Sequence, residues 1–200
     1  MNIDTSLKIM VHAGIYEPAD DSYLLIKAIE VESAERALDM GCGCGIVALH
    51  LARQGCLVTA VDVNEHAVEN TKINAEKNGL AIQVVTSDLF SEIEGTFDVI
   101  TFNPPYLPTE NEDIAWDGGR EGTAIMERFL REAHRHLTGH GRIYMVMSSR
   151  GNIPKLMKMF SGMYRFTEVA QKSFFFERLY VYLIEPLRRG TGKAFPLFFL

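Results

Sequence analysis

The most specific chemistry in this sequence lies in one string that follows an apolar run: Asn103, Pro104, Pro105 and Tyr106. The Asn103 amide oxygen and the Pro104 carbonyl oxygen could each accept one N–H of a planar NH2 group. The Tyr106 ring could stack on that plane and exclude water, while the prolines stiffen the segment. We therefore expect this string to hold an amide or an exocyclic amine; a proline turn without a ligand is the alternative.

A glycine-rich turn stands earlier in the chain, where Gly41, Gly43 and Gly45 occupy every second position of the run MGCGCG. Because glycine has no Cβ, the polar part of a ligand could approach the backbone amides of this turn. The position three residues after Gly43 is Ile46, so the G-x-G-x-x-G pattern of dinucleotide-binding proteins is incomplete. The turn indicates a nucleotide-like ligand and disfavours a nicotinamide oxidoreductase, although a tight turn without a ligand stays open.

Acidic residues end or follow three of the predicted strands. Asp62 lies 19 residues after the middle glycine of the turn, about the spacing at which a carboxylate accepts from ribose hydroxyls. Asp88 could accept from an adenine amino group, and Leu89 offers an apolar contact and a backbone donor. Asp39 could order a ligand ammonium group, directly or through water. Because the carboxyl ends of parallel strands meet at one edge of a sheet, we expect these acids and Asn103 to share a site.

These residues need a framework, and the alternation of short apolar runs with amphipathic stretches predicts one of α/β class with a parallel sheet. Apolar centres indicate strands that are buried on both faces. The predicted parallel strands cover residues 36–39, 57–62, 82–86, 97–102 and 142–147. We expect an antiparallel closing pair at 174–176 and 180–184.

The helices between these strands are predicted from spacing and from their end signals. Asn64 is suited to cap a helix that Gly79 ends. Apolar residues at every fourth position from Ile125 through Leu137 predict a helix that reaches Gly139. Further helices are expected at 18–29, 46–54 and 153–160.

Together these strings resemble the class I S-adenosylmethionine-dependent methyltransferases over nearly the whole chain. DMGCGCG is similar to their first motif, and NPPY is similar to the motif of enzymes that methylate amide or exocyclic amine nitrogens. Asp62 corresponds by this resemblance to the acidic residue that binds the ribose, and Asp88 to the acidic residue that binds the adenine. The resemblance implies a Rossmann-like fold: a mostly parallel seven-stranded sheet with an antiparallel C-terminal strand and helices on both faces. It implies S-adenosylmethionine as cofactor, S-adenosylhomocysteine as product, and these cofactor-binding residues: Tyr16, Ser22, Asp39, Gly41, Gly43, Gly45, Asp62, Asp88, Leu89 and Asn103.

Two further strings are similar to HemK-like glutamine methyltransferases. YEPADDSYLL (16–25) resembles their Y-E-P-A-E-D-T segment, with Ser22 where the family usually has Thr, and a hydroxyl is kept. WDGGREG (116–122) resembles the G-G-R-x-G loop of the archaeal and eukaryotic branch. Its Arg120 and Glu121 could contact a peptide substrate, and a loop salt bridge or solvent exposure is the alternative. About 33 residues precede the first predicted strand. We expect the short branch, without the separate N-terminal domain of bacterial relatives.

The branch methylates N5 of the glutamine in the Gly-Gly-Gln motif of a class I translation release factor, and the resemblance implies that substrate here. Asn103, Pro104 and Tyr106 would be catalytic, and Asn103 through Tyr106 would bind the substrate. The resemblance also implies a small zinc-binding activator subunit, which could pair with the edge of the strand at 82–86. No resident metal is expected.

Composition limits the alternatives. Twenty Lys and Arg against 26 Asp and Glu give a net charge of −6, which disfavours a strongly basic nucleic-acid binder. A methyltransferase that acts on adenine N6 or guanine N2 of RNA or DNA stays open, helped by the basic residues Arg188, Arg189 and Lys193. A non-catalytic subunit that only binds S-adenosylmethionine is the alternative of another class.

We expect one domain over residues 1–187, with an N-terminal helical segment at 1–33 and a tail at 188–200. Cys42, Cys44 and Cys56 are an odd number without a secretory signal, so reduced thiols are expected. No apolar run approaches the roughly 18 residues of a membrane-spanning helix. The expected location is therefore the cytoplasm.

Overall fold

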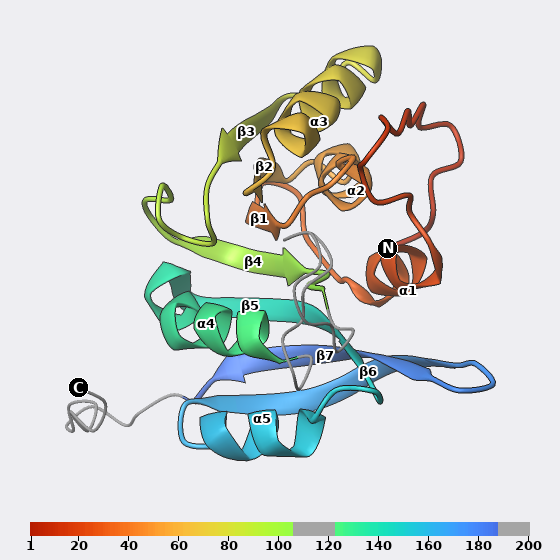
Figure 1. The fold of residues 1–200 in the computed structure, drawn as a ribbon. Helices are drawn as coiled ribbons and strands as arrows, with labels where there is room; N and C mark the ends of the chain where they lie inside the picture. Colours follow the sequence, from red (N-terminus) through yellow and green to blue (C-terminus); the bar gives the residue numbers. More distant parts are fainter. Residues whose placement is uncertain (106–122, 188–200) are drawn as a thin grey trace.

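The computed structural model describes residues 1–105 and 123–187. In these ranges seven strands form one sheet in the order β3-β2-β1-β4-β5-β7-β6 (Figure 1). Neighbours from β3 to β5 are parallel, and β7 runs antiparallel to both β5 and β6. The strands are β1 Arg36–Met40, β2 Leu57–Asp62, β3 Ile82–Thr86, β4 Phe97–Phe102, β5 Leu137–Ser148, β6 Tyr164–Ser173 and β7 Arg178–Pro186. The expected class and sheet are confirmed.

Helices cover both faces of the sheet (Figure 1). Buried side chains of α1 and α2 belong to one apolar core, and those of α4 and α5 belong to the other. Val99 and Ile100, adjacent in β4, are both fully buried and enter opposite cores, so this strand is buried on both faces. The helices are α1 Asp20–Ala28, α2 Ile46–Arg53, α3 Glu65–Lys77, α4 Ala124–Ala133 and α5 Ile153–Phe160, with a 3-10 turn η1 at His134–His136.

The predicted end signals of α3 are confirmed. The Asn64 side chain accepts from the His66 backbone N–H at 2.9 Å, and Gly79 follows the helix with a φ of 62°. Here the local residue types are sufficient to predict where the helix begins and ends, because a capping side chain and a left-handed glycine act within one turn.

Two boundaries were predicted wrongly. Leu137 continues the apolar spacing of α4, but α4 ends at Ala133 and Leu137 pairs with Phe97 as the first residue of β5. Residues 174–176 form the connection between β6 and β7 rather than a strand. The true partner, β6, is a sheet edge with many polar exposed residues, so it lacked the apolar signal that was used to find strands.

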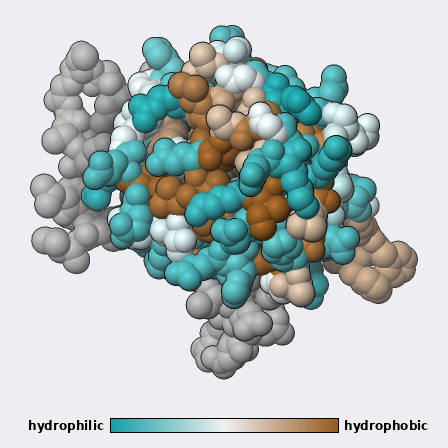
Figure 2. Space-filling view, turned by 90° about the horizontal axis from the view of Figure 1, so that it is seen from above, coloured by the Kyte–Doolittle hydropathy of each residue, from teal (hydrophilic) through white to brown (hydrophobic). Residues whose placement is uncertain are grey.

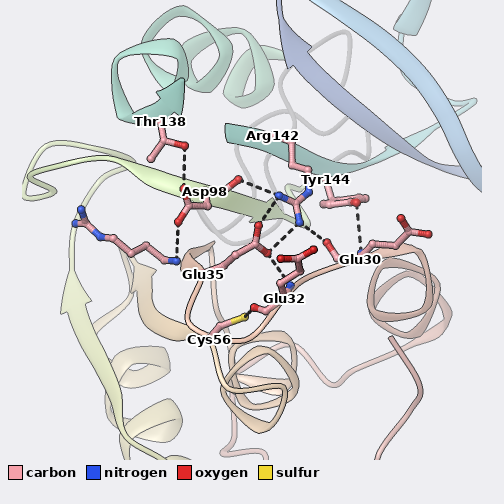
Figure 3. A network of polar contacts seen from close by, with 9 residues as sticks. Glu30, Glu32, Glu35, Cys56, Asp98, Thr138, Arg142 and Tyr144 are labelled. Carbon is pink, nitrogen blue, oxygen red and sulfur yellow. Dashed lines mark hydrogen bonds and ion pairs between the residues drawn. The ribbon is translucent and has the colours of Figure 1, made fainter. Parts of the chain in front are cut away.

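A polar network closes the end of the sheet where the parallel strands begin (Figure 3). The Arg142 guanidinium donates to both carboxylate oxygens of Glu35, at 2.8 and 3.0 Å, and to the Glu30 carbonyl at 2.5 Å. Asp98 accepts from the Thr138 hydroxyl at 2.9 Å. The network joins the segment before β1 to β4 and β5. Among the described residues, no helix is long and apolar enough to cross a membrane.

Candidate active site

A cavity of about 550 Å³ opens where β1, β2 and β4 end. Its walls come from six parts of the chain: residues 14–22, the turn after β1, the segment after β2, the segment after β3, the segment after β4, and the start of α4. The volume lies within the range of sites for small ligands and cofactors. The position is the carboxyl edge of a parallel sheet, where open α/β proteins bind ligands.

The glycine-rich turn has a left-handed backbone. Gly43 has a φ of 56°, and a Cβ on it would meet nothing within 4 Å, so it leaves room beside the cavity. Gly45 has a φ of 83°, and a Cβ there would stand 2.8 Å from the Thr71 side chain. Gly41 and Gly43 line the cavity, whereas Gly45 is needed for close packing against α3 and does not line it.

Asp62 bridges the end of β2 and the glycine turn. Its two carboxylate oxygens accept from the backbone N–H groups of Gly43 and Asn64, each at 2.9 Å. Burial raises the pKa of this carboxyl, and the backbone hydrogen bonds oppose that rise. Each carboxylate oxygen can accept more than one hydrogen bond, so Asp62 can order the turn and still accept from a ligand hydroxyl.

Asp39 lies deeper in the wall and is 3% exposed. It accepts from the Thr101 hydroxyl at 2.8 Å and from the Ala48 backbone N–H at 3.0 Å. Burial raises its pKa to about 7, against the effect of these hydrogen bonds, and the charge of Asp62 adds to the rise. Asp39 therefore ties β1 to β4 and α2 beneath the cavity.

Asp88 and Leu89 form the wall that follows β3. Leu89 is buried in a left-handed conformation with a φ of 52°, and its carbonyl accepts from the Ser87 hydroxyl at 2.9 Å. A non-glycine residue in this region is uncommon, and here the Ser87 side chain helps to fix it. Asp88 is exposed and pairs with the Arg128 guanidinium at 2.7 Å. The acidic residue that was predicted to bind adenine is therefore in an ion pair.

The Asn103 side chain has the most informative geometry in the cavity. Its Oδ1 atom is buried, and among the described residues no donor reaches it. An unpaired buried acceptor costs free energy, so it calls for an explanation such as a missing ligand. Pro104 and Pro105 continue the wall beside it. An N–H that enters the cavity would satisfy this oxygen.

Tyr16 and Ser22 meet on a buried carboxylate, Asp21. The Tyr16 hydroxyl donates to Asp21 at 2.8 Å, and the Ser22 backbone N–H donates to the other oxygen at 2.6 Å. Burial, and then the charge of Asp21, raises the Tyr16 pKa far above its usual value. This group closes the cavity on the side of α1.

The cavity therefore brings together most of the predicted site. Wall residues that were not predicted as part of the site include Asp21, whose signal was its place in YEPADDSYLL, and Ile125 and Arg128 on α4. Tyr106, Arg120, Glu121 and the tail at 188–200 lie outside the described residues. Cys42, Cys44 and Cys56 are buried free thiols. The described residues hold no group of three or more His, Cys, Asp or Glu placed to bind a metal.

The amino-acid sequence is similar to those of known proteins. The methyltransferase small domain pattern matches residues 7–176. A Methanocaldococcus jannaschii protein, named as a candidate protein N5-glutamine methyltransferase, is 38% identical over 72% of this chain and 77% of its own. The mouse methyltransferase HEMK2 is 34% identical over 72% of this chain and 76% of its own.

A solved structure has a similar fold. It is the E. cuniculi Mtq2–Trm112 complex, described as responsible for methylation of the translation termination factor eRF1. It aligns with a TM-score of 0.71 and 25% identity over 86% of this chain and 98% of the matched chain.

Proposed function

The chain belongs to the methyltransferase small domain family, and on that premise we propose that it methylates N5 of a protein glutamine. The proposed substrate is the glutamine in the Gly-Gly-Gln motif of a class I translation release factor. The observation that carries the proposal is the buried Oδ1 of Asn103, which has no hydrogen-bond partner among the described residues and lies in a cavity at the carboxyl edge of the sheet. The names of the relatives support the same chemistry.

The residues present fit S-adenosylmethionine as the methyl donor. Asp62 would accept from the ribose hydroxyls, and the backbone of the glycine turn would contact the polar methionine part. Leu89 would contact the adenine ring, and Asp88 would accept from its amino group once its pairing with Arg128 is shared or released. When bound, the cofactor supplies a methyl group on a sulfonium, whose sulfur leaves as a neutral thioether.

This chain's own part in the reaction is to orient the acceptor nitrogen and to stabilise charge on it. An amide nitrogen is a weak nucleophile because its lone pair is delocalised into the carbonyl. The Asn103 Oδ1 and the Pro104 carbonyl would accept hydrogen bonds from its two N–H groups, fix the plane, and stabilise the positive charge that develops there. After the methyl group is bonded, the nitrogen would lose one proton to water, which leaves the neutral methylated amide. Tyr106 would stack on that plane. Positioning should supply most of the acceleration.

A protein acceptor is favoured over a nucleic acid by charge. The net charge of the chain is −6, and Arg128, the one basic residue in the described part of the cavity wall, is held in an ion pair with Asp88. A flipped base would bring phosphates to this rim, where cations free to bind them are needed. A protein acceptor, whose peptide backbone is uncharged, therefore fits this rim better than a nucleic acid does.

A small partner subunit is a second part of the proposal. In the described sheet β3 pairs with β2 alone and β6 with β7 alone, so both strands are edges. The strand β3, IQVVT, has no charged residue, whereas β6 carries charges and a bulge between Glu168 and Ala170. Charges and bulges protect an edge from pairing. We expect the partner, a zinc-binding subunit by resemblance, to add a strand at β3.

The test is transfer of labelled methyl from S-adenosylmethionine to purified release factor, with and without the candidate partner. Three acceptors are run in parallel: the wild-type factor, a factor whose Gly-Gly-Gln glutamine is replaced, and bulk RNA. Label on the wild-type factor alone is expected. Label on RNA in place of the factor would overturn the proposal in favour of a nucleic-acid methyltransferase. Cofactor binding without transfer to any acceptor would favour a scaffold.

A further inference from the structure

The connection between β6 and β7 presents two aromatic rings to solvent. Phe175 is 91% exposed and Phe176 is 86% exposed, and their ring centroids lie 4.5 Å apart, nearly edge to face. The hairpin projects beyond the other elements of the fold, at the right of Figure 1, and its end is an apolar projection in Figure 2. Singly exposed apolar residues are common, but two adjacent exposed rings at the end of a projecting hairpin indicate a contact surface.

This aromatic tip is anchored on both sides. Before it, the Lys172 ammonium pairs with Asp20 at 2.6 Å, and Asp20 precedes Asp21 of the cavity wall. After it, the Glu177 carboxylate accepts at 2.5 Å from the hydroxyl of Ser148, the last residue of β5. Both anchors lie at the edge of the sheet where the cavity opens. The tip is therefore held beside the rim of the cavity.

The chemistry of the tip selects among partners. Of the two cationic residues that flank the tip in sequence, Lys172 is in an ion pair with Asp20, and Arg178 donates to the neutral Ser173 hydroxyl at 3.1 Å. Lys172 also lies 5.4 Å from the centroid of the Phe174 ring. A phosphate backbone would need these cations, whereas an apolar depression on a protein would need only the rings.

We propose that Phe175 and Phe176 dock into an apolar depression on the protein substrate, beside the loop that carries the methylated glutamine. This inference rests on the proposed function. A glutamine that reaches Asn103 comes from a protein whose surface must lie across the rim, and the tip stands at that rim. The rings act on substrate affinity, because they line no part of the cavity.

The experiment compares the wild-type chain, with its partner subunit if activity needs it, and the double variant Phe175→Ser/Phe176→Ser. Methyl transfer is measured against the concentration of intact release factor. The KM for the factor is expected to rise about tenfold or more, since exposed aromatic anchors carry much of an interface. The kcat and the affinity for S-adenosylmethionine should stay within about twofold, because the fold and cavity are untouched. A matched control is Leu57→Ser, at a residue 64% exposed on β2, which should leave the KM unchanged.

An unchanged KM in the double variant would overturn the docking role. A double variant that changes only the oligomeric state in solution would also overturn it, because the tip would then be a contact between copies of this chain. Loss of methyl transfer to RNA, with the factor unaffected, would assign the tip to base stacking instead. If the wild-type chain does not label the factor, the proposed function fails and the docking role fails with it, whatever the variants do.

Discussion

Asn74 and Met10 exchange two hydrogen bonds, as paired residues of a sheet do. The Met10 N–H donates to Asn74 Oδ1 at 3.0 Å, and Asn74 Nδ2 donates to the Met10 carbonyl at 2.7 Å. Asn78 repeats the exchange with Lys8, and Asn70 accepts from the His12 N–H. The asparagines are four positions apart on a helix, a rise of about 6 Å, and their partners are two positions apart in an extended segment, a rise of about 6.6 Å. The two spacings therefore match.

The same Asn74 amide also donates to the Cys44 carbonyl at 2.9 Å. Helix α3 therefore fixes the glycine turn and the N-terminal segment relative to each other. Residues 14–16, which follow that segment, line the cavity. This arrangement leads to the first prediction.

Asn74→Ala should lower the free energy of unfolding by about 1–3 kcal/mol, because the partly buried Met10 N–H and the buried Cys44 carbonyl lose the Asn74 side chain as a partner. It should also weaken binding of S-adenosylmethionine more than it lowers kcat, since it loosens two walls of the cavity. Urea unfolding and calorimetric titration measure both effects. Asn78→Ala, whose bonds to Lys8 are exposed, is the control and should cost less than about 1 kcal/mol. Equal losses in the two variants would contradict this role of Asn74.

Asn103→Ala should lower kcat by about 100-fold, because the variant loses an acceptor aimed at charge that develops in the reaction. The affinity for S-adenosylmethionine should change little. Steady-state rates and a binding titration on the same preparation separate the two quantities. A fall in cofactor affinity as large as the fall in kcat would show that Asn103 mainly binds the cofactor.

Asp62→Ala should have the opposite profile. It removes the acceptor for the ribose hydroxyls and the carboxylate that holds the Gly43 N–H. The Kd for S-adenosylmethionine should rise about tenfold or more, with a smaller effect on kcat at saturating cofactor. If kcat at saturation falls further than cofactor affinity does, the ribose role is wrong.

Asp39 should make stability fall as pH rises. Its pKa in the fold is about 7, above the usual value of 3.8. Between these values the folded state binds more protons than the unfolded state, so the contribution of this group is present below about pH 4 and lost through about pH 7. Urea unfolding at a series of pH values should show the loss, and Asp39→Asn should reduce it. An identical pH dependence in wild type and variant would contradict the assignment.

Arg142→Met should destabilise the fold by about 1–3 kcal/mol, because it leaves a partly buried Glu35 without its paired donor. The Glu35 pKa is lowered, chiefly by its hydrogen bond to Arg142, so this stability is present above the usual carboxyl range and lost as pH falls into it. The kcat should be unchanged, because the network lies at the end of the sheet away from the cavity. Arg53→Met breaks a more exposed pair with Asp4 and should cost no more than about 1 kcal/mol.

The sequence by itself determined the fold class, the five parallel strands and a part of the cavity wall. Strand and helix signals are local, because they depend on the spacing of apolar residues and on caps within one turn. Once the strands are known to be parallel, their carboxyl ends must meet, so Asp39, Asp62 and Asn103 could be assigned to one site. The geometry of a parallel sheet supplies the rest of that argument.

Only the tertiary structure decided how distant residues are paired. Met10 and Asn74 are 64 positions apart, and Asp88 and Arg128 are 40 apart, separations at which local spacing carries no signal. Leu137 fits the pattern of a helix, yet its pairing with Phe97 places it in β5. The exposure of Phe175 likewise depends on where the hairpin ends relative to the rest of the fold. Such outcomes follow from packing between elements, which a local pattern does not encode.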